Sequence, residues 1–68
     1  MGEVIFVVEE APEGGYAARA LNAPIFTEAH TLAELPDQVR DAVPCHFDEG
    51  QAPRVIRLHF VRDEVITV

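Results

Sequence analysis

The hydrophobic period of this chain changes once along its length and then changes back. Residues 3–29 hold three runs in which apolar residues are continuous or alternate, and residues 31–47 carry apolar residues at helical spacing. Alternation returns from Arg54. A period of two is typical of strands and a period near 3.6 is typical of helices. The sequence therefore predicts the order β-β-β-α-β, an α+β fold.

The first run, "EVIFVV" (Glu3–Val8), is β-branched or aromatic almost throughout, which is typical of a strand buried on both faces in the centre of a sheet. Further strands are predicted at Tyr16–Leu21 and at Pro24–Ala29, and the latter alternates as a strand with one solvated face does. Because strand–helix–strand crossovers are right-handed, we expect the last long strand beside the first, in parallel. The predicted sheet is mainly antiparallel, ordered 3-2-1-4, with the helix on one face.

Two adjacent glycines, Gly14 and Gly15, separate the first two strand patterns, and Tyr16 opens the second. Glycine supplies positive φ at both central positions of a primed hairpin turn without strain. A phosphate-binding loop would instead lead from a strand into a helix, with further glycines or a lysine. We therefore expect a structural hairpin here.

The helical segment opens on a capping box, "TLAE". In such a box the Thr31 hydroxyl accepts from the Glu34 N–H, and the Glu34 side chain reaches back to the Thr31 N–H. Apolar residues recur at helical spacing on one face: Leu32, Leu35, Val39, Val43 and Phe47. Pro36 and Pro44 each remove a backbone donor, at a cost of about 3 kcal/mol inside a regular helix. We expect a helix over 32–43, with any continuation kinked at Pro44.

The last strand pattern begins at Arg54 and has two different faces. Ile56, Leu58 and Phe60 point one way, and Val55, Arg57, His59 and Val61 point the other. The second set mixes apolar and polar side chains, which suits an interface with a partner or a second copy better than open water. After "RDE" at 62–64, Val65–Val68 is either a short fifth strand or a tail, and the residues leave both open.

Size and charge limit the classes of function. The chain has 68 residues, so we expect a single domain over residues 1–68 that is small enough to associate with a copy or a partner. Its net charge of −7 would repel a nucleic-acid backbone or an anionic membrane and suits a basic protein partner, although it also serves solubility. No apolar run approaches the ~20 residues of a membrane span, and no signal peptide is visible. We expect a cytoplasmic protein.

Catalytic and metal-binding chemistry finds little support in the residues. The chain has 12 Asp and Glu residues, and such residues can hold Mg²⁺ in nucleases, but here they fall in predicted turns and at the ends of elements. The other candidates, Cys45 and the histidines His30, His46 and His59, show no metal-ligand spacing. Cys45 is interpreted as a small apolar core residue. We expect no catalytic residue, no metal and no cofactor.

The order and spacing of the local sequences resemble the HicB-like family of small bacterial and archaeal proteins. The resemblance rests on "VIFVVEEAPEGGYAARA", "FTEAHTLAEL" and "VRDAV", and covers Val4 to about Phe47. It implies a truncated ribonuclease-H-like unit without catalytic residues, which acts as an antitoxin by masking a HicA-type mRNA-cleaving toxin. Full antitoxins also carry a C-terminal DNA-binding segment, whereas the residues after Gly50 here predict strand. The chain is thus similar to a stand-alone HicB-like domain.

Two non-enzymatic hypotheses of function follow, and a third, a cryptic metal-dependent nuclease, has the least support from the residues. The first is an antitoxin-like interaction module that binds a small basic partner. The alternative is an oligomeric module that binds a small ligand or regulates, with its site between subunits. A homo-oligomer is expected in either case.

Overall fold

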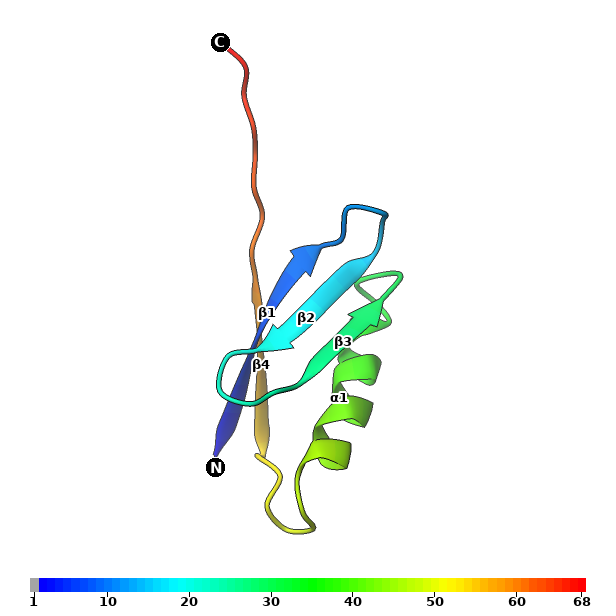
Figure 1. Ribbon diagram of the computed structural model, residues 1–68, viewed down its shortest axis with the longest axis vertical. Coiled ribbons are helices and arrows are strands. Elements are labelled where there is room, and N and C mark those ends of the chain that lie inside the picture. Colours follow the sequence, from blue (N-terminus) through cyan, green and yellow to red (C-terminus); the bar gives the residue numbers. More distant parts are fainter. Residues whose placement is uncertain (1) are drawn as a thin grey trace.

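The computed structural model describes residues 2–68 and contains one helix packed beside a four-stranded sheet (Figure 1). The strands are β1 (Glu3–Glu10), β2 (Tyr16–Ala20), β3 (Phe26–Ala29) and β4 (Val55–Phe60), and the helix is α1 (Leu35–His46). The sheet order is β3-β2-β1-β4. Strand β1 is antiparallel to β2 and parallel to β4, and β2 is antiparallel to β3. These observations confirm the predicted α+β fold, the strand order and the parallel return of the last strand.

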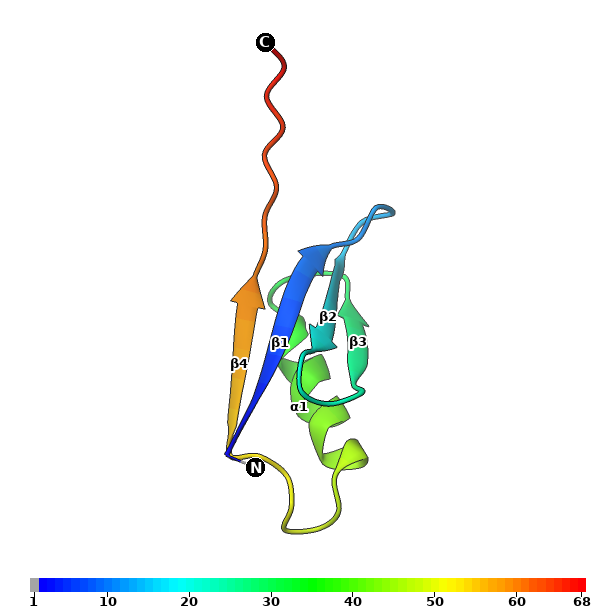
Figure 2. The same cartoon turned by 60° about the vertical axis from the view of Figure 1, so that its left-hand side comes forward.

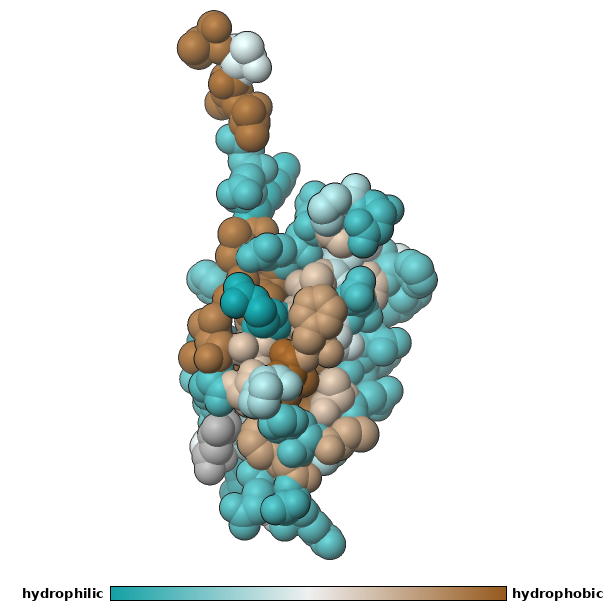
Figure 3. Space-filling view, viewed as in Figure 1, coloured by the Kyte–Doolittle hydropathy of each residue, from teal (hydrophilic) through white to brown (hydrophobic). Residues whose placement is uncertain are grey.

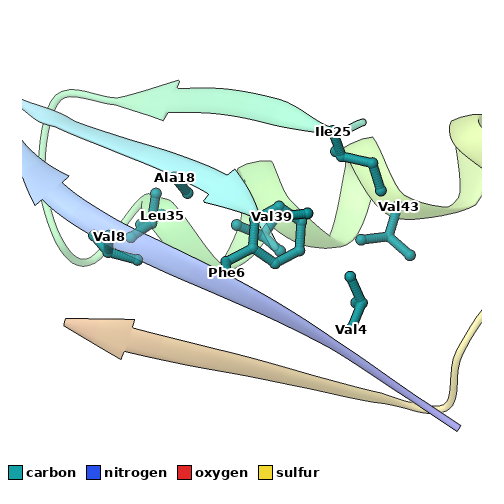
Figure 4. Close-up of a cluster of buried hydrophobic side chains, with 9 residues drawn as sticks. Val4, Phe6, Val8, Ala18, Ile25, Leu35, Val39 and Val43 are labelled. Carbon is teal, nitrogen blue, oxygen red and sulfur yellow. The ribbon is translucent and has the colours of Figure 1, made fainter. Parts of the chain in front are cut away.

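The core lies between α1 and one face of the sheet (Figures 1 and 2). Leu35, Val39 and Val43 come from one side of α1, and all three are buried, as their helical spacing predicts. They pack in one cluster with Val4, Phe6 and Val8, the alternate residues of β1 that face the helix (Figure 4). The fully buried side chains are Phe6, Leu35, Val4, Val8, Val39 and Val43. A period-two strand and a period-3.6 helix therefore meet through their apolar faces.

The second face of β1 differs from expectation. Ile5 and Val7, which alternate with the buried residues, are only half-buried. The helix covers one face of the sheet, and no other described element covers the opposite face (Figure 2). The prediction of a central strand is confirmed, but the prediction of burial on both faces is wrong for this face.

The first hairpin uses both glycines, in a turn longer than predicted. The loop runs from Ala11 to Gly15, and the Gly14 N–H donates to the Ala11 carbonyl at 3.0 Å, which closes a turn across Pro12 and Glu13. Gly14 and Gly15 then have positive φ of 102° and 82°. The positive φ values are confirmed, but the glycines end a five-residue loop rather than form the centre of a two-residue turn.

The helix begins and ends three residues later than expected, at Leu35 and His46. The Glu34 N–H does donate to the Thr31 hydroxyl at 3.2 Å, but this bond closes a turn before the helix. Glu34 itself is the N-cap, without a side-chain capping bond. The later start places Pro36 in the first turn, where the helix needs no N–H from it. Leu32 consequently lies outside the helix and is exposed, and α1 continues through Pro44.

Asn22 extends the pairing of β1 beyond the end of β2. Its side-chain carbonyl accepts from the Ile5 N–H at 3.3 Å, and its amide donates to the Glu3 carbonyl at 3.1 Å. We expect Asn22→Ala to lower the free energy of unfolding by about 1–3 kcal/mol, since two hydrogen bonds are lost. Urea denaturation measures the difference. Asn22→Asp keeps the acceptor for Ile5 but sets a carboxylate oxygen against the Glu3 carbonyl, so it should restore little of the stability that Asn22→Ala loses. Equal stability of all three proteins would contradict this role.

The end of the chain is a tail in this structure. The Val61 N–H donates to the Val8 carbonyl at 2.9 Å, which is the last backbone bond between this segment and β1. Residues 61–68 belong to no helix or strand and are exposed. In Figures 1 and 2 they continue the line of β4 away from the body. Of the two alternatives left open for Val65–Val68, the structure shows the tail.

Candidate functional surfaces

The predicted interface residues lie on the face of the sheet that α1 leaves uncovered. Val55, Arg57, His59 and Val61 are all exposed. The strand register aligns this row with half-buried residues of β1, because Arg57 is paired with Ile5 and His59 with Val7. Figure 3 shows apolar and polar residues interspersed on the side of the molecule turned toward the viewer. The structure thus gathers the predicted residues into one mixed surface, and their role stays a prediction.

One ion pair crosses this surface. The Arg57 guanidinium lies 2.8 Å from a carboxylate oxygen of Glu3, and it also donates a hydrogen bond to that oxygen from Nε at 2.9 Å. The Arg57 side chain is 63% exposed, so solvent screens the pair and its contribution to stability is at most about 1 kcal/mol. Its clearer effect is to hold Arg57 over β1.

A cleft of about 480 Å³ lies where the β1–β2 hairpin, the end of β3 and the start of α1 meet. The hairpin contributes Glu13, β3 contributes Glu28, and Glu34 precedes α1. His30 also lines the cleft. The remaining lining residues are Gly14, Gly15, Ala29 and Gln38.

The β2–β3 register places these residues around one cleft. Tyr16 is paired with Ala29, so the hairpin lies beside the end of β3. The approach is close: a Cβ placed on Gly15 would lie 2.7 Å from the Ala29 carbonyl oxygen. The Thr31–Glu34 turn then carries the chain from β3 into α1 and leaves Glu34 at the cleft. Gly14 and Gly15 therefore shape the cleft without supplying chemistry to it, whereas the helix-opening turn contributes the Glu34 carboxylate.

The chemistry of the cleft is that of carboxylate acceptors on an open surface. Carboxylates bind guanidinium and ammonium groups, and the bidentate pairing with arginine is the stronger of the two. Within residues 2–68, no three His, Cys, Asp or Glu side chains are grouped so that they could hold a metal ion. The arrangement thus fits a basic group on a partner.

The sequence predicts Glu13 in a hairpin turn, Glu28 in a strand and Glu34 in a capping box, and does not join the three. Glu13 lies 15 residues before Glu28 in the chain, and no motif connects the two. The signal that could have found the cleft is the predicted 3-2-1 meander, which brings the first hairpin beside the end of the third strand. The exact register was needed, and only the structure gives it.

The remaining candidates do not form a site with one another. Cys45 is exposed and unpaired by a disulfide, so its interpretation as a core residue is wrong. It follows Val43 by two positions, which rotates it about 200° from the buried side of α1. His46 packs edge-on against Phe47 with ring centroids 5.2 Å apart, and His59 is exposed on β4. Across residues 2–68, no helix has the length and apolar character to cross a membrane.

Fold and surface together define a small α+β protein with a helix on one face of its sheet, an uncovered opposite face and an acidic cleft. The chain belongs to the UPF0150 family. It is 42% identical over 66 residues to a UPF0150 protein of Thermotoga maritima, an alignment that covers 97% of this chain and 93% of that protein. A UPF0150 protein of Archaeoglobus fulgidus is 56% identical over 52 residues, which cover 76% of this chain and 77% of that protein. No family model and no solved structure matches the chain.

Proposed function

We propose that this protein is a non-enzymatic interaction module of the HicB-like type, which binds and masks a small basic protein such as a HicA-type mRNA-cleaving toxin. The observation that carries the proposal is the acidic cleft, in a chain of net charge −7. The resemblance of Val4–Phe47 to HicB-like domains supports the same assignment.

Charge distribution supports a basic partner. Glu9 and Glu10 end β1, next to the hairpin that carries Glu13, and both are exposed. Together with the cleft carboxylates they form a strongly acidic end of the molecule. Such a surface accelerates encounter with a basic protein and weakens as salt screens it. The mixed sheet face around Arg57 and His59 can add apolar contact area to the same complex.

The proposal is tested by affinity capture from lysate of the source organism, at low and at high salt, with mass spectrometry of the bound proteins. The expected result is one small basic protein that is retained at low salt and depleted at high salt. Recovery of this chain alone, or of proteins that are retained equally at low and at high salt, would contradict the proposal.

A matched pair of triple variants locates the contact. We expect E13Q/E28Q/E34Q to weaken binding of the captured protein at least about tenfold, which corresponds to about 1.4 kcal/mol. D41N/D48N/E49Q removes the same number of charges at exposed positions outside the cleft and should change affinity much less. Isothermal titration calorimetry on the three proteins measures the difference. Equal weakening by both variants would mean that only net charge matters and would contradict a role for the cleft.

The alternative, a small-ligand or regulatory module, has one observation in its favour. The cleft volume of about 480 Å³ falls in the range of small-molecule sites, roughly 300–1,000 Å³. Its open, carboxylate-rich lining would select cationic metabolites such as polyamines. A thermal-shift screen with cationic metabolites separates the two functions, because a ligand that binds only the folded protein raises Tm increasingly as its concentration exceeds Kd.

A further inference from the structure

The tail that follows β4 is an apolar segment without a partner in its own body. The tail exposes most of the surface of Val65, Ile66 and Val68. The whole chain measures 52 × 20 × 18 Å, and the tail forms one end of the long dimension (Figure 1). A run of exposed apolar side chains is typical of interaction sites.

The neighbouring edge of the sheet, strand β4, has unpaired backbone groups along its free side. β4 is an edge strand, paired with β1 on one side, and a strand edge of this kind is a template for a further strand. On the helix-side face of β4, Ile56 and Leu58 are only half-buried and Phe60 is 55% exposed. A groove of about 230 Å³ runs between α1 and β4, lined by Pro36, Val39, Arg40, Ile56 and Leu58.

We propose that two copies of this chain pair along β4 and its tail, so that the tail of each copy adds a strand to the β4 edge of the other. The tail continues the line of β4 (Figure 2), so β4 and the tail of one copy can run antiparallel to β4 and the tail of the other. A two-fold axis near residue 63 then relates the two copies and closes the dimer. Four extended residues span about 13 Å and β4 about 20 Å, so Val65–Val68 fits within the edge.

The pleat determines which tail residues meet the groove. Side chains of even number in β4 face α1, since Ile56 and Leu58 pack against the core. If the tail continues this alternation, Ile66 and Val68 face the same side. Ile66 would then lie opposite the second copy's Phe60, and Val68 opposite its Leu58. The two side chains would cover the half-exposed apolar row on the helix-side face of β4.

Charge complementarity selects this register. When Ile66 lies opposite Phe60 of the second copy, Arg62 lies opposite the second copy's Glu64, and symmetry repeats the pair. The same axis places Asp63 opposite the second copy's Asp63, so two favourable charge pairs stand against one unfavourable pair. Opposite charges directly across an antiparallel pair are favourable. A register shifted by two residues toward the start of β4 would instead place Arg62 opposite Arg62.

A return of the tail onto its own β4 edge is the competing arrangement, and local sequence disfavours it. A two-residue hairpin turn at Asp63 and Glu64 would need positive φ at both in type I′, and in type II′ at Asp63, a position that favours Gly. Asp accepts that conformation at modest cost, whereas Glu does not. The tail is also extended in the structure, and no residue of the described chain has positive φ except glycines. The exchange between copies is independent of the proposed basic partner, because it uses neither the cleft nor a second protein.

Sedimentation equilibrium of the pure protein over a range of concentrations tests the exchange. We expect a dimer, and we expect I66D/V68D to be monomeric at concentrations at least tenfold above those at which the wild type is a dimer. T67D, on the opposite side of the same tail, is the control and should weaken the dimer less. R62E should weaken the dimer and R62E/E64R should restore it. A wild-type monomer at all concentrations, or a dimer that I66D/V68D leaves intact, would overturn the proposal.

Disulfide trapping distinguishes exchange from return of the tail within one chain. In a C45S background, a mixture of F60C and I66C chains should give the mixed disulfide-linked dimer as its main crosslinked product. Absence of that product, or an intrachain disulfide in the F60C/I66C double variant as its only product, would overturn the exchange.

Discussion

Phe6→Ala is expected to destabilise the protein by about 3–5 kcal/mol, a loss that removes most of the stability of a 68-residue domain. Phe6 is 0% exposed and lies among Leu35, Val39 and Val43 of α1 in the centre of the core (Figure 4). The substitution deletes apolar contacts and leaves a cavity that neither the short helix nor the sheet can fill. Denaturant unfolding followed by circular dichroism measures the loss.

Phe26→Ala is the matched control, since Phe26 is 60% exposed on the uncovered face of the sheet. It should cost less than about 1 kcal/mol. If Phe6→Ala fails to fold, Phe6→Leu keeps the measurement available and should cost about 1–2 kcal/mol. Similar losses from Phe6→Ala and Phe26→Ala would contradict the assignment of a single core beneath α1.

Gly15→Ala is expected to cost about 2–4 kcal/mol, the second largest effect. Two causes add: φ at Gly15 is 82°, and the new Cβ would lie 2.7 Å from the Ala29 carbonyl oxygen. The atom met is backbone, so relief requires the hairpin and β3 to move apart. Thermal unfolding measures the cost.

Gly14→Ala separates the two causes. Gly14 has φ of 102°, but a Cβ there meets nothing within 4 Å. Its cost should be about 1–2 kcal/mol, from backbone strain alone. An equal cost at the two glycines would mean that the close approach of the hairpin to β3, and with it the shape of the cleft, is not as described.

The architecture could be predicted from the sequence because the hydrophobic period is a local property. The alternation at Phe26–Ala29, the buried spacing of Leu35, Val39 and Val43, and the parallel return of Val55–Phe60 all follow from pattern and handedness. Element ends were less predictable. The sequence predicts Thr31 as a helix cap, but the bond that its hydroxyl accepts from the Glu34 N–H closes a turn before the helix.

The candidate surfaces depend on tertiary arrangement, which the sequence encodes less directly. The acidic cleft requires the register that pairs Tyr16 with Ala29, and a shift by two residues would move Glu28 away from the hairpin. The half-burial of Ile5 and Val7 depends on what covers the far side of the sheet, which composition does not specify. Residue type alone predicts Cys45 in the core, whereas its helical phase turns it outward.

The most direct test of the central claim is an RNA-cleavage assay with the basic protein that this chain captures. The account predicts that the captured protein alone cleaves RNA, and that cleavage stops when the wild-type chain is added at an equimolar amount. E13Q/E28Q/E34Q should need a large excess to do the same. Continued cleavage in the presence of a formed complex, or a captured protein without activity on RNA, would contradict masking of a toxin.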